Sequence, residues 1–215
     1  MFHALLVTWF GWVRDWGYGG VVILMAMESS IFPVPSEVVV PPAAYWAAQG
    51  RMSFWGVVVA GTVGSYLGSA ITYIVAQKVG LPFINRFGRY FFMSPEKLKM
   101  AEGWVRQYGV GGIFFARLLP VVRHLISIPA GILHMSFARF SAATIVGSLI
   151  WCTVLAWFGQ EVIGGRPDLM ENPEALVLAL KEKLHVVIFA IIGGAVAYGA
   201  MAVLRSRLSK KAVGP

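Results

Sequence analysis

The sequence predicts an all-α integral membrane protein, built as an inverted repeat of a re-entrant helical hairpin followed by a transmembrane helix. Three observations support this fold class. Hydrophobic residues make up 58% of the 215 residues and charged residues only 13%, about half the charged fraction of a soluble domain. Two long apolar runs are uninterrupted, and two others are broken by prolines that have charged residues beside them. Charged residues at membrane depth are costly and mark functional sites.

The net charge of +8 does not indicate a nucleic-acid partner. Most Lys and Arg residues fall in loops and in the C-terminal tail, where they set membrane orientation and meet anionic lipid. Cys152 is the only cysteine, so no intramolecular disulfide is expected. No spacing of His, Asp or Glu resembles a metal site, and Ser36 and Ser127 have no base nearby in sequence. We therefore expect no metal, no cofactor and no enzymatic activity.

Residues 1–16 are expected to form an interfacial helix, because its tryptophans recur at helical spacing and the segment is too short to span. The membrane domain is predicted to cover 17–165. Its first part, 17–50, contains Pro33 and Pro35, which prevent one continuous helix. Neither arm reaches the roughly 20 residues needed to cross a bilayer. A re-entrant hairpin that turns at these prolines is therefore predicted.

Residues 54–76 are predicted to form the first transmembrane helix. Small residues recur every four positions in this segment, and this spacing lets a second helix approach closely. The same row could also support a homodimer. Its members are Gly56, Ala60, Gly64 and Gly68.

Residues 78–106 are basic and polar, and we expect them to form an amphipathic region on the cytoplasmic side. Ser94, Pro95 and Glu96 predict a helix start, with Ser as the N-cap and Pro at the first helical position. Gly109 is a residue at which that helix can end.

A second re-entrant segment is predicted over 107–138, with turns at Pro120 and Pro129. A second transmembrane helix over 140–160, a polar loop over 166–183, and a C-terminal transmembrane helix with a basic tail over 184–215 complete the chain. The charge pattern favours re-entry of the second hairpin. Only then do the basic loop and the basic tail both face the cytoplasm, as the positive-inside rule requires.

The two halves resemble each other. Pro33 precedes a span centred near Ser65, and Pro120 precedes a span centred near Ile150 at a closely similar offset. Met52-Ser-Phe54 and Met135-Ser-Phe137 stand at matching places before the two spans. Because the two spans are expected to run in opposite directions, the repeats are inverted, which is an architecture of transporters.

Four charged residues at the proline breaks are the candidate site. Arg117 and Arg123 flank Pro120, so both guanidinium groups could converge on a lipid phosphate from the two sides of a turn. Glu28 and Glu37 are candidates for proton coupling, since a carboxyl group in a dry site can take up a proton near neutral pH. We expect a carboxylate to pair with an arginine until phosphate displaces it. The alternatives are a permanent salt bridge and snorkelling arginines.

These residues resemble the motifs of the DedA family, part of the VTT-domain superfamily. The resemblance covers roughly 17–165 and includes Glu28, Pro33-x-Pro35-Ser36-Glu37, and Phe114-x-x-Arg117-x-x-Pro120-x-x-Arg123. Ala130-Gly131, Met135, Phe137, Gly147 and Trp151 also fit. Ser69 stands where relatives often have Asp, and Gln160 replaces a Tyr that is common in relatives.

The resemblance implies a transporter in the bacterial inner membrane that moves undecaprenyl phosphate or phosphatidylethanolamine between leaflets, with protons as the coupled species. We expect this function, with a cytoplasmic C-terminus. Two alternatives remain open at this point: a proton-coupled small-ion antiporter, and a membrane assembly factor that transports nothing.

Overall fold

A computed structural model describes residues 2–30, 34–87, 95–119, 122–164 and 193. Within these ranges the only regular secondary structure is helix, and no strand is present among them. Four features predicted from the sequence lie outside the described residues: the turn prolines Pro33 and Pro120, the loop 166–183, and, apart from residue 193, the C-terminal segment 184–215.

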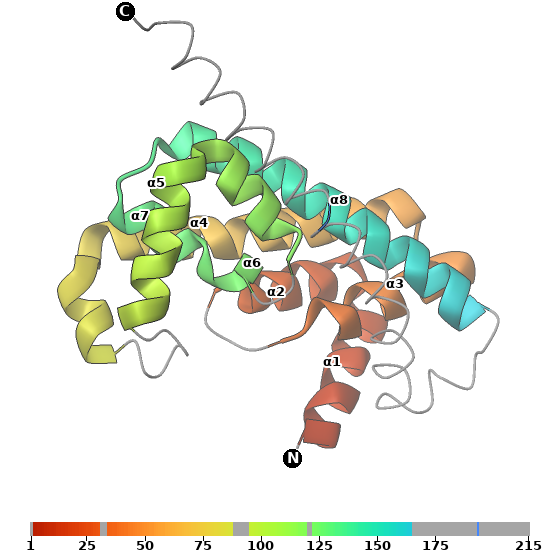
Figure 1. Cartoon of the computed structure of the whole chain (residues 1–215). Helices are drawn as coiled ribbons and strands as arrows, with labels where there is room; N and C mark the ends of the chain where they lie inside the picture. The colour runs from red at the N-terminus through yellow and green to blue at the C-terminus, as the bar shows by residue number, and fades with distance from the viewer. Residues whose placement is uncertain (1, 31–33, 88–94, 120–121, 165–192, 194–215) are drawn as a thin grey trace, which may run out of the picture.

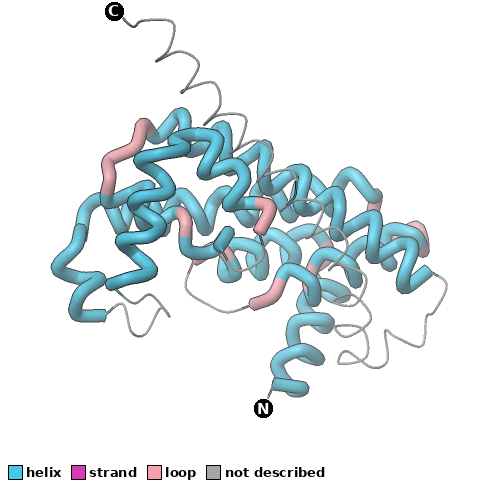
Figure 2. Tube along the Cα trace, in the orientation of Figure 1, coloured by secondary structure: helices cyan, strands magenta, loops and turns pink. Residues whose placement is uncertain are grey.

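The described chain contains one short 3₁₀ helix and a series of α-helices (Figures 1 and 2). Their bounds are α1 Phe2–Trp16, α2 Tyr18–Glu28, η1 Ser36–Val38, α3 Val40–Ala48, α4 Phe54–Phe87, α5 Pro95–Arg117, α6 Val122–Leu125, α7 Ser127–Ile132 and α8 Phe137–Gly164.

Helices α4 and α8 contain the two segments that are long and apolar enough to cross a membrane, Phe54–Val79 and Phe137–Glu161. They pack against each other and run in opposite directions (Figure 1). Both predicted spans are confirmed as apolar helices, although each helix is longer than the sequence pattern suggested. Helix α4 continues to Phe87 even though Gly80 and Pro82 follow residue 76.

The outer faces of these two helices are apolar and exposed. Val63, Leu67 and Ile71 follow one another along α4 and are 42%, 45% and 58% exposed. On the opposite face of α4, Ser65 and Ser69 are fully buried. This arrangement is the reverse of a soluble protein, where serines face water and aliphatic side chains are inside. It is the pattern expected of a helix bundle that is surrounded by lipid.

The other helices pack on the two long helices, α4 and α8. Helix α2 packs on α4, and α3, which follows it in the chain, packs on α8. In the second half, α5 packs on α8 and α7 packs on α4. The helix after the break in each half, α3 or α7, therefore packs on the long helix of the other half.

Glycines make these close crossings possible. A Cβ on Gly64 or Gly68 would meet the carbonyl oxygens of Val22 and Ala26 in α2. A Cβ on Gly159 would lie 2.6 Å from the Cα of Pro41 in α3. The small-residue row of α4 is thus used within the chain to hold α2.

A nine-residue motif occurs twice, before each broken segment. Trp12-Val-Arg-Asp-Trp-Gly-Tyr-Gly-Gly20 and Trp104-Val-Arg-Gln-Tyr-Gly-Val-Gly-Gly112 share Trp, Val, Arg and three Gly at equivalent positions. The backbone is also equivalent, with φ 54° and ψ −127° at Gly17 and φ 53° and ψ −128° at Gly109. Gly109 interrupts the helix, as the sequence predicted: its backbone is not helical, and α5 consists of two helical parts that meet there.

Two apolar clusters enclose a polar centre. The larger cluster joins α1, α2, α3, the start of α4 and the end of α8, around Trp151 and Leu155. The smaller one joins the end of α4 to α5, α7 and the start of α8, around Tyr73 and Phe140. Ser65 and Ser148 lie between the two clusters, near the middle of the two candidate spans. The polar centre is therefore at mid-depth of the bundle.

Candidate functional site

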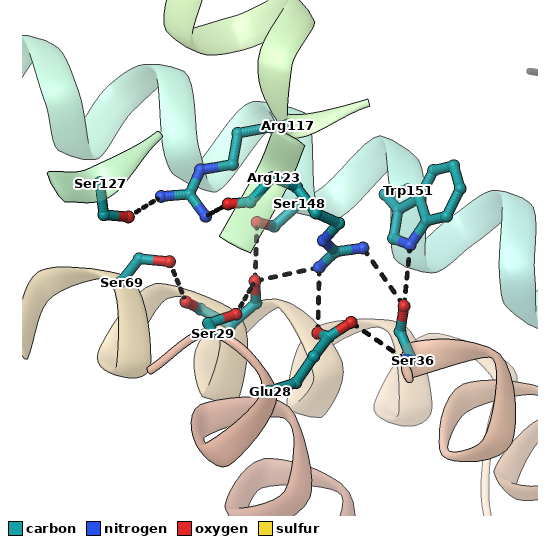
Figure 3. Close-up of polar contacts among 10 residues, drawn as sticks. Glu28, Ser29, Ser36, Ser69, Arg117, Arg123, Ser127, Ser148 and Trp151 are labelled. Atoms are coloured by element: carbon teal, nitrogen blue, oxygen red, sulfur yellow. Dashed lines mark hydrogen bonds and ion pairs between the residues drawn. The ribbon is translucent and has the colours of Figure 1, made fainter. Parts of the chain in front are cut away.

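Glu28, Arg117 and Arg123 meet in the polar centre, and each side chain is almost completely buried (Figure 3). They come from three elements: Glu28 ends α2, Arg117 ends α5, and Arg123 lies in α6. Both helix ends are produced by the proline-containing breaks that follow them in the sequence. The breaks thus place charged side chains at helix ends inside the bundle.

Glu28 and Arg123 form an ion pair. The Arg123 Nη2 donates to the Glu28 Oε2 at 3.3 Å, and the Ser36 backbone N–H donates to the other carboxylate oxygen at 3.0 Å. The Arg123 guanidinium also lies 5.4 Å from the ring centroid of Trp151. Charge-assisted N–H···O bonds are usually about 2.7–2.9 Å long. The Glu28–Arg123 contact is therefore a long one.

Arg117 is a buried cation without a carboxylate in contact, as far as the described chain shows. Its Nη1 donates to the backbone carbonyl of Arg123 at 2.9 Å, and its Nη2 donates to the Ser127 Oγ at 2.6 Å. Its Cζ lies 5.6 Å from the ring centroid of Phe140. These contacts bring the two arginines together across the second broken segment, and within the described residues they give Arg117 no carboxylate in direct contact.

A set of serine hydroxyls surrounds the ion pair. The Ser65 Oγ lies 3.0 Å from the Ser29 Oγ, 3.1 Å from the Ser148 Oγ and 3.3 Å from the Arg123 Nη2. A hydroxyl group has one proton to donate and can accept two hydrogen bonds. Because Arg123 is always a donor, Ser65 must accept from one neighbouring serine and donate to the other. The α4 and α8 serines are thereby joined to the charged pair.

Ser36, the first residue of η1, connects the segment after the first proline break to the same site. Its Oγ accepts from the Trp151 Nε1 at 3.2 Å and from the Arg123 Nη1 at 3.5 Å. Together with its backbone N–H on Glu28, Ser36 therefore contacts three members of the cluster.

The remaining predicted site residues lie at the edge of the cluster or in its support. Glu37 follows Ser36 in η1, is partly buried, and makes no ion pair within the described residues. Its carboxyl is near enough to Glu28, Arg123 and His124 to interact with their charges. Pro35 is the residue before η1, and Pro129 is buried within α7. Pro129 is thus part of a helix and not of a turn.

Several residues of the polar centre are not predicted from the sequence. Ser65 lies beside a row of small residues that indicates only a packing face, and no motif distinguishes Ser29 or Ser148. The sequence does contain one signal, because a serine near the middle of a long apolar run is unusual. Their partners, however, come from distant parts of the chain, and no local pattern reveals them.

Comparison with known proteins agrees with this architecture. The VTT domain profile matches residues 34–161, which include η1, both long helices, Arg117 and Arg123. The chain belongs to the DedA family of VTT-domain membrane proteins.

Several relatives of this DedA protein are named as transporters. It is 34% identical over 161 residues to undecaprenyl phosphate transporter A of Bacillus subtilis, an alignment that covers 75% of this chain and 79% of the relative. It is 30% identical over 152 residues to undecaprenyl phosphate transporter A of Staphylococcus aureus, covering 69% and 75% of the two chains. No solved structure matches this DedA protein.

One relative has a name that refers to an enzyme. A protein of Lactococcus lactis that is called alkaline phosphatase-like is 32% identical over 188 residues, covering 82% of this chain and 88% of the relative. Within the described residues of this DedA protein, no three His, Cys, Asp or Glu side chains gather where they could hold a metal ion. The transporter names and the family match support the prediction that this chain is not an enzyme.

Proposed function

We propose that this protein moves a phosphate-bearing lipid, undecaprenyl phosphate or phosphatidylethanolamine, between the leaflets of the bacterial inner membrane. The observation that carries the proposal is the pair of buried guanidinium groups at mid-depth of the bundle, which a single ion-paired carboxylate balances within the described residues. The names of the two transporter relatives support the same substrate class.

The architecture supports a path for a polar headgroup. The arms of the first broken segment are short, with 11 residues in α2 and 9 in α3, and neither is long enough to cross a bilayer. We propose that both broken segments enter the membrane as re-entrant hairpins from opposite faces, with the C-terminus in the cytoplasm. Two such hairpins would shorten the apolar barrier between the leaflets, while the lipid tails remain in the hydrocarbon core.

The excess positive charge favours an anionic headgroup. Arg117 and Arg123 carry two positive charges, and Glu28 is the one carboxylate of the described chain in direct contact with either of them. A buried charge without a counter-ion is strongly unfavourable, so an anion that enters the cluster gains a large electrostatic stabilisation. Guanidinium groups suit phosphate because their planar donors match its oxygens.

The long Glu28–Arg123 contact supports proton coupling as part of this proposal. A phosphate that takes the place of Glu28 on Arg123 leaves a buried carboxylate without its partner, and such a group gains a proton. The charged or titratable groups that face Glu28 are Arg117, Arg123, Glu37, His124 and Cys152. Release of the lipid would return Glu28 to Arg123 and free the proton.

Transport in proteoliposomes tests the function. Vesicles that contain fluorescent polyprenyl phosphate or phosphatidylethanolamine are exposed to a quencher of the outer leaflet, with and without a pH gradient. We expect the protein to expose inner-leaflet lipid, and to do so faster with the gradient. The Glu28→Gln variant should express normally and lose the gradient dependence, because the amide matches the carboxyl group in shape but cannot bind a proton.

The same vesicles distinguish the other functions. A small-ion antiporter would leave the lipids in place and would change the signal of a lumenal pH dye when cations are added. An assembly factor would change neither signal. Loss of folding in Glu28→Gln would indicate that the ion pair is a permanent structural bridge.

A further inference from the structure

Thr144 differs from the other hydroxyl-bearing residues of the two long helices. Thr62, Ser69, Thr72 and Thr153 each donate a hydrogen bond to the carbonyl four residues earlier in their own helix, at 2.6 to 2.9 Å. This is the usual way in which a helix satisfies such a hydroxyl. Thr144 is completely buried in α8, yet its Oγ1 has no hydrogen-bond partner in the described part of the chain.

A second orphan donor belongs to Arg117. The guanidinium uses Nη1 and Nη2 in hydrogen bonds, while its Nε has no partner among the described residues. Arg117 is only 1% exposed. A buried donor without a partner destabilises the folded protein, so a protein that keeps two such donors incurs a cost that a ligand can remove.

The Arg117 side chain runs along the face of α8 that carries Thr144. At its base, the Arg117 Cβ lies against Gly147 of α8, where an added Cβ would be 2.6 Å away. At its end, the Arg117 Cζ lies over the ring of Phe140. Phe140, Thr144 and Gly147 are spaced by four and three residues and share one face of α8. Thr144 therefore lies on the face of α8 that the Arg117 side chain follows, between the positions that contact its Cβ and its guanidinium group.

We propose that the Thr144 hydroxyl and the Arg117 Nε together bind one oxygen of the phosphate group of the transported lipid. This inference rests on the proposed function and adds a ligand to it. A phosphate oxygen accepts several hydrogen bonds, so one oxygen can satisfy both donors at once. Arg117 then contributes the charge, and Thr144 contributes a neutral hydrogen-bond donor. Together they favour a charged phosphate oxygen over the hydroxyl group of a lipid alcohol, which is a weaker acceptor.

A single methyl-for-hydroxyl exchange tests the subsite. Thr144→Val keeps the shape of the side chain and removes the orphan hydroxyl, and Thr62→Val is the matched control because the hydroxyl of Thr62 is satisfied by its own helix. Binding is measured in detergent by the rise in melting temperature with polyprenyl monophosphate, the corresponding polyprenol, or inorganic phosphate.

We expect Thr144→Val without lipid to be as stable as the wild type or more stable, because a buried unsatisfied group has been removed. The same variant should bind polyprenyl monophosphate about 10-fold to 100-fold more weakly, as expected for the loss of a hydrogen bond to a charged group. Its affinity for polyprenol should not change, and Thr62→Val should bind as the wild type does. A comparable loss for inorganic phosphate would show that recognition needs no lipid tail.

Three results would overturn the inference. One is unchanged affinity of Thr144→Val for polyprenyl monophosphate while the wild type binds it, which refutes the subsite alone. Another is an equal loss for polyprenol and its phosphate. The third is a wild type that binds no polyprenyl phosphate, which refutes the proposed function as well. Thr144→Ser and Thr144→Ala, which differ only in the hydroxyl, give a second comparison if the valine variant folds poorly; the serine variant should retain the affinity.

Discussion

Arg123 is the residue on which the polar contacts of the site converge. Its guanidinium contacts Glu28, Ser36, Ser65 and the ring of Trp151, and its carbonyl accepts from Arg117. A buried ion pair contributes little net stability, but removal of one partner leaves an uncompensated charge. The energetic consequence of losing Arg123 is therefore set mainly by what happens to Glu28.

We predict that Arg123→Gln lowers the free energy of unfolding by about 3–5 kcal/mol at pH 8, and by much less at pH 5. In this variant the buried Glu28 has no cation in contact, so folding above the usual titration range of a carboxyl group requires proton uptake. Stability consequently falls as pH rises. Thermal unfolding in detergent across this pH range measures the effect.

The double variant Glu28→Gln/Arg123→Gln is the control. It removes both charges and should be more stable than Arg123→Gln at pH 8, with a weaker dependence on pH in this range. Equal stability of the single variant at both pH values would contradict the prediction.

At this scale the sequence identified the charged residues but not their environment. Glu28, Arg117 and Arg123 could be predicted because charged residues beside prolines in an apolar run are costly to bury and are rarely present without a functional role. Which carboxylate pairs with Arg123 could not be predicted, since Glu28 and Glu37 are both near the same prolines. The choice is made by the end of α2, which places Glu28 in the interior, and by η1, which leaves Glu37 at the edge.

The elements of the two halves are related through the repeated motif around Gly17 and Gly109. In each copy, an aromatic pair one helical turn apart precedes the glycine: Trp12 with Trp16, and Trp104 with Tyr108, with ring centroids 5.3 Å and 4.4 Å apart. The glycine then changes the course of the chain with a positive φ that other residues rarely adopt. The motif therefore sets the angle at which α2 and the second part of α5 enter the bundle.

We predict that Gly17→Ala and Gly109→Ala each destabilise the protein by about 1–3 kcal/mol, because alanine is strained in this backbone conformation. No neighbouring atom of the described chain would block the added methyl group at Gly109, and at Gly17 the nearest is the Met52 Sδ at 4.0 Å. The loss therefore comes from the backbone alone, and thermal unfolding of both variants measures it.

Gly19→Ala is the matched control. It lies in the first turn of α2, has open space around it within the described structure, and should be neutral or slightly stabilising since alanine favours helices. A similar loss at Gly19 would show that backbone strain is not the cause.

Helix positions were predictable where the apolar pattern is long, as in α4 and α8. The division of the second broken segment into α6 and α7 was not, because these helices have only 4 and 6 residues and no pattern of that length is diagnostic. The nine-residue repeat is present in the sequence and can be found by comparing the chain with itself. Its glycines and tryptophans have ordinary interpretations, as helix ends and interfacial anchors, when each is considered alone.

In the whole molecule, neither half can form the site by itself. Helix α2 brings Glu28 from the first half, α5 and α6 bring the arginines from the second, and α3 and α7 pack on the long helix of the opposite half. The general architecture of paired broken segments and spans follows from the sequence. The exchange of arms between halves does not, since it depends on contacts between residues far apart in the chain.

We predict that fragments 1–90 and 91–215 are degraded when each is produced alone, and that together they restore lipid transport. Each fragment alone exposes glycine-lined grooves and unpaired buried charges. Protein levels in membranes and the proteoliposome assay measure the outcome. A first fragment that accumulates stably without the second would show that the crossed packing is dispensable.

The separation of Glu28 and Arg123 by 95 residues also has a consequence for biogenesis. A ribosome that adds about 5–20 residues per second needs roughly 5 to 20 s to make the intervening chain. During that interval the carboxyl group has no guanidinium to neutralise it, so the first broken segment must wait, protonated or near the headgroups, before it reaches its final position. Completion of the polar centre is thus a late event that follows synthesis of the second broken segment, and insertion factors would encounter the nascent protein in this half-assembled form.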